Sequence, residues 1–235
     1  MTAKSISAGQ GAGWLKCGWN LFKQDYGTWF IMFLIFIGIA IVLNFIPFVG
    51  SLALSLISPV LMAGFMYSAA QLDQGSTIEI GNLFQGFKDK ERMNKLLILG
   101  ALSLLASIVL MLIVFALVGG SAMMNIDEST GTIDPESMMS GGMIFSFLLI
   151  ALAGLLIAMG FLFATPLVML DKLSPVDSIK ASFSACLKNI LPLLVFSIIY
   201  ILLAIVAAIP LGLGFLILIP VTILAVYCGY RSIFH

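Results

Sequence analysis

Charged residues are absent from four long blocks of the sequence. The blocks cover residues 28–72, 96–126, 137–170 and 189–230, and none of them contains Asp, Glu, Lys or Arg. A bilayer requires such blocks, because an ionised side chain at its centre costs at least about 2.5 kcal/mol. With 61% hydrophobic and 9% charged residues, the chain has the composition of a membrane protein. This composition excludes soluble enzymes, nucleic-acid binders and disordered scaffolds.

The lengths of the uncharged blocks predict the number of membrane helices. One such helix needs about 20 apolar residues, so a block of twice that length must fold back on itself. Pro47 and Gly50 mark a turn in the first block, and Pro210 marks one in the last. We expect an all-α polytopic membrane protein, a single domain over 1–235, with six transmembrane helices in three hairpins and an outer loop at 119–142. The expected spans are 28–45, 51–70, 96–118, 143–170, 190–208 and 213–230.

The distribution of basic residues predicts the orientation. If both termini are cytoplasmic, all 11 Lys and Arg residues lie in cytoplasmic segments, as the positive-inside rule requires. The stretch before residue 28 lacks the apolar core of a cleavable signal peptide, so the first span should remain in the mature protein. We expect a multi-pass protein of the bacterial inner (cytoplasmic) membrane. The outer loop, in contrast, is acidic through Asp127, Glu128, Asp134 and Glu136.

Three cytoplasmic stretches, one before each pair of spans, have helical periodicity. In the clearest, Ser174 and Asp177 have the spacing of a capping box, and apolar residues then recur on one face up to Leu187. Residues 80–87 have the same periodicity, and residues 14–26 are rich in aromatic side chains. We expect three cytoplasmic amphipathic helices whose basic residues lie at the membrane interface. These residues are Lys16, Lys23, Lys88, Lys90, Arg92, Lys180 and Lys188.

The second span of each pair contains a proline, at Pro59, Pro166 and Pro220, which completes an internal threefold repeat. A proline inside a helix frees a backbone carbonyl and kinks the helix. Two interpretations stay open. Either the three kinks line a functional cavity, or they shape the packing of the hairpins.

The residue types that usually carry chemistry are missing from the expected spans, which hold no ionisable Asp, Glu, Lys, Arg or His. His235, the only histidine, is expected to be a solvated chain end. Cys17, Cys186 and Cys228 lie in or near cytoplasmic segments, so we expect reduced thiols and no metal site. We therefore expect no catalytic, cofactor-binding or metal-binding residues, and no cofactor. The methionines of the outer loop are expected to form an apolar lid rather than a copper site.

Several strings in the chain carry a family resemblance. They include residues 46–53, 59–64, 83–87, 182–186 and the closing segment 230–234. On these strings the chain resembles the BPSS-type family of uncharacterised bacterial six-helix integral membrane proteins. The resemblance implies a bacterial inner-membrane protein with six spans, and it implies no catalytic or binding residues.

The absence of chemistry and the three basic stretches favour one function. We expect a non-enzymatic inner-membrane protein, an envelope-associated accessory or assembly factor that acts at the lipid and cytoplasmic interface. The alternative is a transporter or channel for a lipid or small uncharged solute. The expected partners are membrane lipids and other membrane proteins or further copies of the chain, with no nucleic acid.

Overall fold

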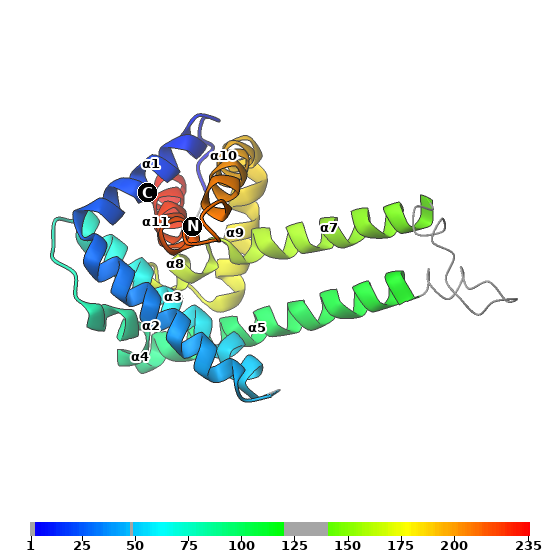
Figure 1. Cartoon of the computed structure of the whole chain (residues 1–235), viewed down its shortest axis with the longest axis horizontal. Coiled ribbons are helices and arrows are strands. Elements are labelled where there is room, and N and C mark those ends of the chain that lie inside the picture. The colour runs from blue at the N-terminus through cyan, green and yellow to red at the C-terminus, as the bar shows by residue number, and fades with distance from the viewer. Residues whose placement is uncertain (1–2, 48, 120–140) are drawn as a thin grey trace, which may run out of the picture. The chain divides into compact units, whose positions relative to one another are not determined.

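The computed structural model describes residues 3–47, 49–119 and 141–235 (Figure 1), and its regular elements in these ranges are all helical. The expected outer loop lies almost wholly outside the described residues. The elements are α1 (Gln10–Gln24), α2 (Tyr26–Asn44), α3 (Val49–Asp73), the 3₁₀ helix η1 (Ile80–Phe84), α4 (Gln85–Lys88), α5 (Lys90–Val114), the π-helix η2 (Phe115–Gly119), α7 (Gly141–Phe161), α8 (Ala164–Met169), α9 (Pro175–Lys188), α10 (Ile190–Ala208) and α11 (Phe215–Phe234).

Six segments of the described residues are long and apolar enough to cross a membrane, which confirms the predicted number. They are Tyr26–Asn44, Val49–Asp73, Lys90–Val118, Ile144–Met169, Ile190–Ala208 and Phe215–Phe234. Each overlaps one expected span, and the third begins six residues earlier than expected because Lys90 and its polar neighbours are also helical. The prediction of an all-α membrane protein is therefore confirmed at this level.

The fourth span is interrupted between α7 and α8. Proline has no backbone N–H and its ring clashes with the carbonyl four residues earlier, which for Pro166 is that of Leu162. The helix is interrupted at Leu162 and Phe163, just before this proline. The same residue type is accommodated inside continuous helices at Pro59 in α3 and Pro220 in α11.

Ser182 of α9 closes the break. The backbone N–H of Phe163 donates to Ser182 Oγ at 3.0 Å, and this hydroxyl donates to the carbonyl of Met159 at 2.7 Å. A regular helix would join Phe163 and Met159 directly. The hydroxyl is inserted into that bond, so both backbone groups are satisfied and α9 is fixed against the break.

Helix α1 packs along α11 and α10, although α1 and α11 are far apart in the sequence (Figure 1). Two glycines allow the close approach. A Cβ on Gly11 would lie 2.0 Å from the carbonyl oxygen of Pro192, and one on Gly18 would lie 2.6 Å from that of Val221. A larger residue at Gly11 would push α1 away from α10, and one at Gly18 would push it away from α11.

Aromatic side chains dominate the core around α1. The Trp14 ring lies 5.9 Å from Phe196 and 6.4 Å from Phe163, and its Nε1 donates to Ser232 Oγ at 2.9 Å. Trp29 is fully buried, and its Nε1 donates to the carbonyl of Leu21 at 3.1 Å. Each indole N–H thus has a partner, as buried tryptophans require.

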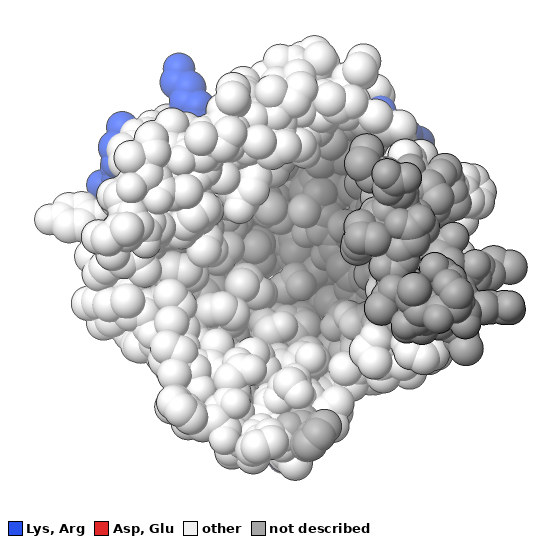
Figure 2. Space-filling model, turned by 45° about the vertical axis from the view of Figure 1, so that its right-hand side comes forward, with Lys and Arg blue, Asp and Glu red and all other residues white. Residues whose placement is uncertain are grey.

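The chain divides into two compact units. One contains residues 1–101 and 159–235, and the other contains residues 102–158, the distal parts of α5 and α7. In the second unit large apolar side chains such as Met111 and Phe147 are exposed. The face of the molecule in Figure 2 displays no acidic side chain and only a few basic ones at its rim. Such surfaces suit contact with lipid.

Candidate functional site: a polar layer at the helix ends

Polar contacts concentrate where α3, α8 and α11 end. Arg231 in the last turn of α11 forms an ion pair with Asp73, the last residue of α3. The hydroxyl of Tyr227, one turn before Arg231, donates to the same carboxylate at 3.1 Å. One carboxylate thus receives two donors from α11, and the ends of the two helices are held together.

A second group of contacts lies beside the first. Tyr230 donates its hydroxyl to Asp171, which directly follows α8, at 2.6 Å. His235 Nε2 lies 3.4 Å from the other oxygen of Asp171 and 3.0 Å from the Tyr230 hydroxyl. His235 is thus exposed, as expected of a solvated chain end, but it has partners in Asp171 and Tyr230 that were not expected. The sequence could not place Asp171 beside the chain end, because the two are 64 residues apart.

The N-terminal segment joins the same region. Lys4 Nζ donates to the carbonyl of His235 at 2.6 Å, and the Lys4 backbone N–H donates to Ile233. The buried side chain of Asn189, just before α10, accepts from the Ile6 N–H and donates to the Lys4 carbonyl, both at 2.9 Å. Lys95 of α5 donates to the carbonyl of Lys172 at 3.1 Å. We call the following residues the polar layer: Lys4, Asp73, Lys95, Asp171, Asn189, Tyr227, Tyr230, Arg231 and His235.

A disulfide bond borders the polar layer. Cys17 of α1 and Cys228 of α11 are joined, with their Cα atoms 6.3 Å apart. The expectation of reduced thiols is therefore wrong for this pair, because the packing of α1 on α11 brings together two cysteines that no local pattern connects. A disulfide is rare in the reducing cytosol, so this bond argues against the cytoplasmic placement from which reduced thiols were expected. Both cysteines line a cavity of about 430 Å³ that is also lined by Arg231 and His235.

Cys186 is the one free cysteine of the described residues. It is buried on α9, and its Sγ lies 3.4 Å from the carbonyl of Met159, beside the bonds of Ser182. Burial raises the pKa of the Cys186 thiol to about 11, because the thiolate is poorly solvated there. The thiol therefore stays neutral at physiological pH and is a poor nucleophile.

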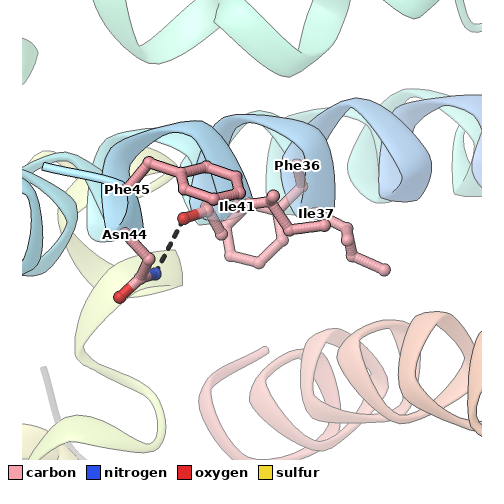
Figure 3. A pocket seen from close by; sticks show the side chains of 6 residues that line it. Phe36, Ile37, Ile41, Asn44 and Phe45 are labelled. Atoms are coloured by element: carbon pink, nitrogen blue, oxygen red, sulfur yellow. Dashed lines mark hydrogen bonds between the residues drawn. The ribbon is translucent and has the colours of Figure 1, made fainter.

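Pro59, Pro166 and Pro220 are all buried in the protein. None of these three prolines lines any of the five cavities that the structure describes. One of the five cavities is a groove at the C-terminal end of α2, lined by Phe36, Ile41 and Phe45 among others (Figure 3). In that groove the side-chain Nδ2 of Asn44 donates to the backbone carbonyl of Ala40, one turn earlier in the same helix, at 2.7 Å. Whether Pro59, Pro166 and Pro220 line a pathway stays a prediction.

The seven basic residues expected at the interface lie on α1, α4, α5 and α9. Six are exposed, and Arg92 is half-buried with Nε 3.1 Å from Asp89 Oδ2. None of the seven belongs to the polar layer. The placement of these seven residues at the membrane interface stays a prediction, and the tyrosines and aspartates of the polar layer were not predicted. The available signal was weak: Asp73 and Asp171 each follow an uncharged block directly, and Tyr227 and Tyr230 lie one turn apart.

The polar layer is suited to holding helix ends together. The described residues contain no group of three or more His, Cys, Asp or Glu side chains that could hold a metal ion. The acidic and methionine-rich positions of the outer loop lie outside the described residues. Comparison with known proteins finds no matching family model, no matching curated protein and no matching solved structure.

Proposed function

We propose that the chain is a multi-pass protein of the bacterial inner membrane, with cytoplasmic termini, that acts as a non-enzymatic, envelope-associated accessory or assembly factor at the interface between lipid and cytoplasm. Its partners are membrane lipids and other membrane proteins or further copies of itself. The membership in the BPSS-type family that the sequence strings indicate is part of this proposal. The single observation that carries it is the surface of α9.

Helix α9 has three different faces. Small residues, among them Ser178, Ser182 and Ala185, are buried against the protein. A second face carries large apolar side chains, with Val176 50% and Leu187 49% exposed. The third face is polar and exposed; it contains Asp177, Lys180, Ser184 and Lys188.

These faces match a helix that lies in the membrane interface. An interfacial helix needs an apolar side for the acyl chains and a basic side for the headgroups and water. The small-residue side of α9 leaves room for close packing on α8. A solvated loop or a helix in the cytoplasm would have no reason to expose Val176 and Leu187 on one side.

The arrangement of contacts supports a threefold repeat. Each stretch that precedes a pair of spans contacts the proline-bearing helix of the pair before it: η1 and α4 contact α3, and α9 contacts α8. The first stretch, α1, contacts α11, the proline-bearing helix of the last pair. The three cytoplasmic stretches and the three proline-bearing helices would then form a closed ring, with the Cys17–Cys228 disulfide at the closure.

The polar layer supports a common side for the helix ends. It joins the ends of α3, α8 and α11 to the beginnings of α5 and α10, which are all cytoplasmic in the proposed topology. Helices that alternate in direction bring these ends to the same side. The polar side chains then lie at one membrane surface, where water and headgroups can solvate them.

The interrupted fourth span is the observation that favours the alternative, a transporter or channel. Broken helices often bind substrates in transporters, through backbone groups that the break exposes. Here Ser182 satisfies the N–H of Phe163 and the carbonyl of Met159. The break therefore offers neither of these groups to a substrate, and we favour the accessory function.

Liposomes that contain the purified protein separate the two functions. We expect no solute flux and no lipid scrambling above empty liposomes, for the wild type and for Pro59→Ala, Pro166→Ala and Pro220→Ala, while the variants change thermal stability. A flux or scrambling activity of the wild type that the proline variants abolish without loss of folded yield would replace the proposal with the transporter. A known scramblase in parallel liposomes shows that the assay detects transport.

A further inference from the structure

Two apolar cavities lie on either side of Trp19. The first, of about 470 Å³, is formed by α1, α10 and α11, and its lining includes Leu15, Val206 and Val221. The second, of about 460 Å³, is lined by residues around the junction of α1 and α2, among them Phe22 and Phe30. Trp19 and Ile217 line both cavities, so they form the wall between them.

The packing of α1 explains why Trp19 is available at this place. Gly18 contacts the backbone of α11, so the next residue points along the edge of the helix contact. Trp19 is 43% exposed, whereas Trp14 and Trp29 are buried. An indole ring at such an edge is amphipathic and can line an apolar cavity that lipid enters. Pro210 and Gly214 also line the first cavity, so in the proposed topology this cavity extends towards the outer turn of the last hairpin.

Two lysines flank Trp19 on the same face of α1. Lys16 precedes it by three residues and Lys23 follows it by four, which are the spacings of neighbours on a helix surface. Lys23 Nζ lies 5.8 Å from the centre of the Trp19 ring. Both lysines are exposed, α1 contains no acidic residue, and neither lysine forms an ion pair with a carboxylate of the described residues.

We propose that this site binds one anionic phospholipid, with one acyl chain in each cavity and the phosphate at Lys16 and Lys23. The inference rests on the proposed function, because it requires this face of α1 to meet lipid. Two adjoining apolar cavities match the two chains of a phospholipid. The unpaired positive charges select an anionic headgroup over a zwitterionic one, since each lysine near an anionic lipid surface favours binding by roughly fivefold.

Quenching of Trp19 fluorescence by brominated lipids tests the site in the full-length protein. The protein is reconstituted in unlabelled phosphatidylcholine with a small fraction of brominated phosphatidylglycerol or, in parallel, brominated phosphatidylcholine. Subtracting the signal of Trp19→Phe isolates the contribution of Trp19. We expect half-maximal quenching at a severalfold lower fraction of the anionic lipid than of the zwitterionic one.

Two pairs of variants separate the headgroup from the chains. The Lys16→Gln/Lys23→Gln double variant should lose the preference for the anionic lipid, whereas Lys180→Gln/Lys188→Gln on α9 should keep it. Val206→Phe, which fills the first cavity, should weaken quenching by the anionic lipid. Ile201→Phe, at an exposed position of the same helix that does not line the cavity, should leave it unchanged.

Each result decides between the site and the function on which it rests. Equal quenching by the two lipids, or a preference that survives the Lys16→Gln/Lys23→Gln change, would overturn the specific site while this face still meets lipid. No quenching even in a fully brominated bilayer would show that Trp19 does not face lipid. That outcome would overturn both the site and the interfacial placement of α1.

Discussion

The hydroxyl of Ser182 occupies the place of a backbone hydrogen bond at Phe163. Because it accepts from the Phe163 N–H and donates to the Met159 carbonyl, Ser182→Ala leaves two polar groups without these partners in a buried region. We expect the free energy of unfolding to fall by about 1–3 kcal/mol, measured by chemical denaturation in detergent. Ser184→Ala, at an exposed position on the same helix, is the matched control and should change it by less than about 0.5 kcal/mol. Equal effects would mean that the bridge does not stabilise the break.

The Cys17–Cys228 disulfide should stabilise the packing of α1 on α11. It closes a loop with a sequence separation of 211 residues, for which the chain-entropy model gives an upper value of about 5 kcal/mol. We expect Cys17→Ser, Cys228→Ser and treatment with a dithiol reductant to lower the thermal unfolding temperature by similar amounts. In the Cys186→Ala variant the reductant should lower the unfolding temperature by as much as in the wild type. An unfolding temperature that the reductant does not alter would contradict the stabilising role.

Burial of Cys186 predicts a thiol that reacts slowly and in a pH-dependent way. With its pKa raised to about 11, the thiol should be alkylated increasingly fast from pH 8 to 11 in the folded protein, as measured by mass spectrometry. An unfolded cysteine has a pKa near 8.5, so it ionises first as the pH rises. The contribution of the neutral thiol to stability is therefore complete below about pH 8.5 and is lost towards pH 11. Alkylation at pH 7 as fast as in denatured protein would contradict the burial.

Introducing charged residues on α9 tests the proposed roles of its apolar and polar faces. Replacing Phe183 and Leu187 with Asp places carboxylates on the face that is proposed to meet acyl chains, so membrane insertion or folded yield should fall strongly. Replacing Lys180 and Ser184 with Ala changes only the polar face and should have a small effect. Membrane fractionation and fluorescence-detected size-exclusion chromatography measure both. Equal losses from the two double variants would indicate a solvated segment.

The sequence predicted the membrane-length helices well because that prediction depends on composition. An uncharged block such as residues 189–230 can hardly form anything else in a bilayer. A kink at Pro166 was predicted too, but the same rule applies to Pro59 and Pro220, which lie inside continuous helices. That only the fourth span is interrupted had to come from the structure.

Tertiary contacts account for what the sequence did not predict. The Cys17–Cys228 pair and the contact of His235 with Asp171 both depend on how distant helices pack, and no local pattern encodes them. On α9 the apolar residues were found, but the buried face is made of small residues such as Ser182. Small polar residues give no hydrophobic signal, so periodicity alone could not reveal which side of α9 meets the protein.

The central claim, a multi-pass membrane protein with its basic surface and both termini in the cytoplasm, is tested most directly by the accessibility of single cysteines in intact cells. With Cys17, Cys186 and Cys228 replaced, one cysteine is introduced at residue 20, 90, 130, 180 or 235 and exposed to a membrane-impermeant maleimide. In cells whose outer membrane is permeabilised while the inner membrane stays intact, we expect labelling of residue 130. The other four positions should be labelled only after lysis. Protection of residue 130 until lysis, with labelling of residues 20, 90, 180 or 235 from outside, would contradict the account.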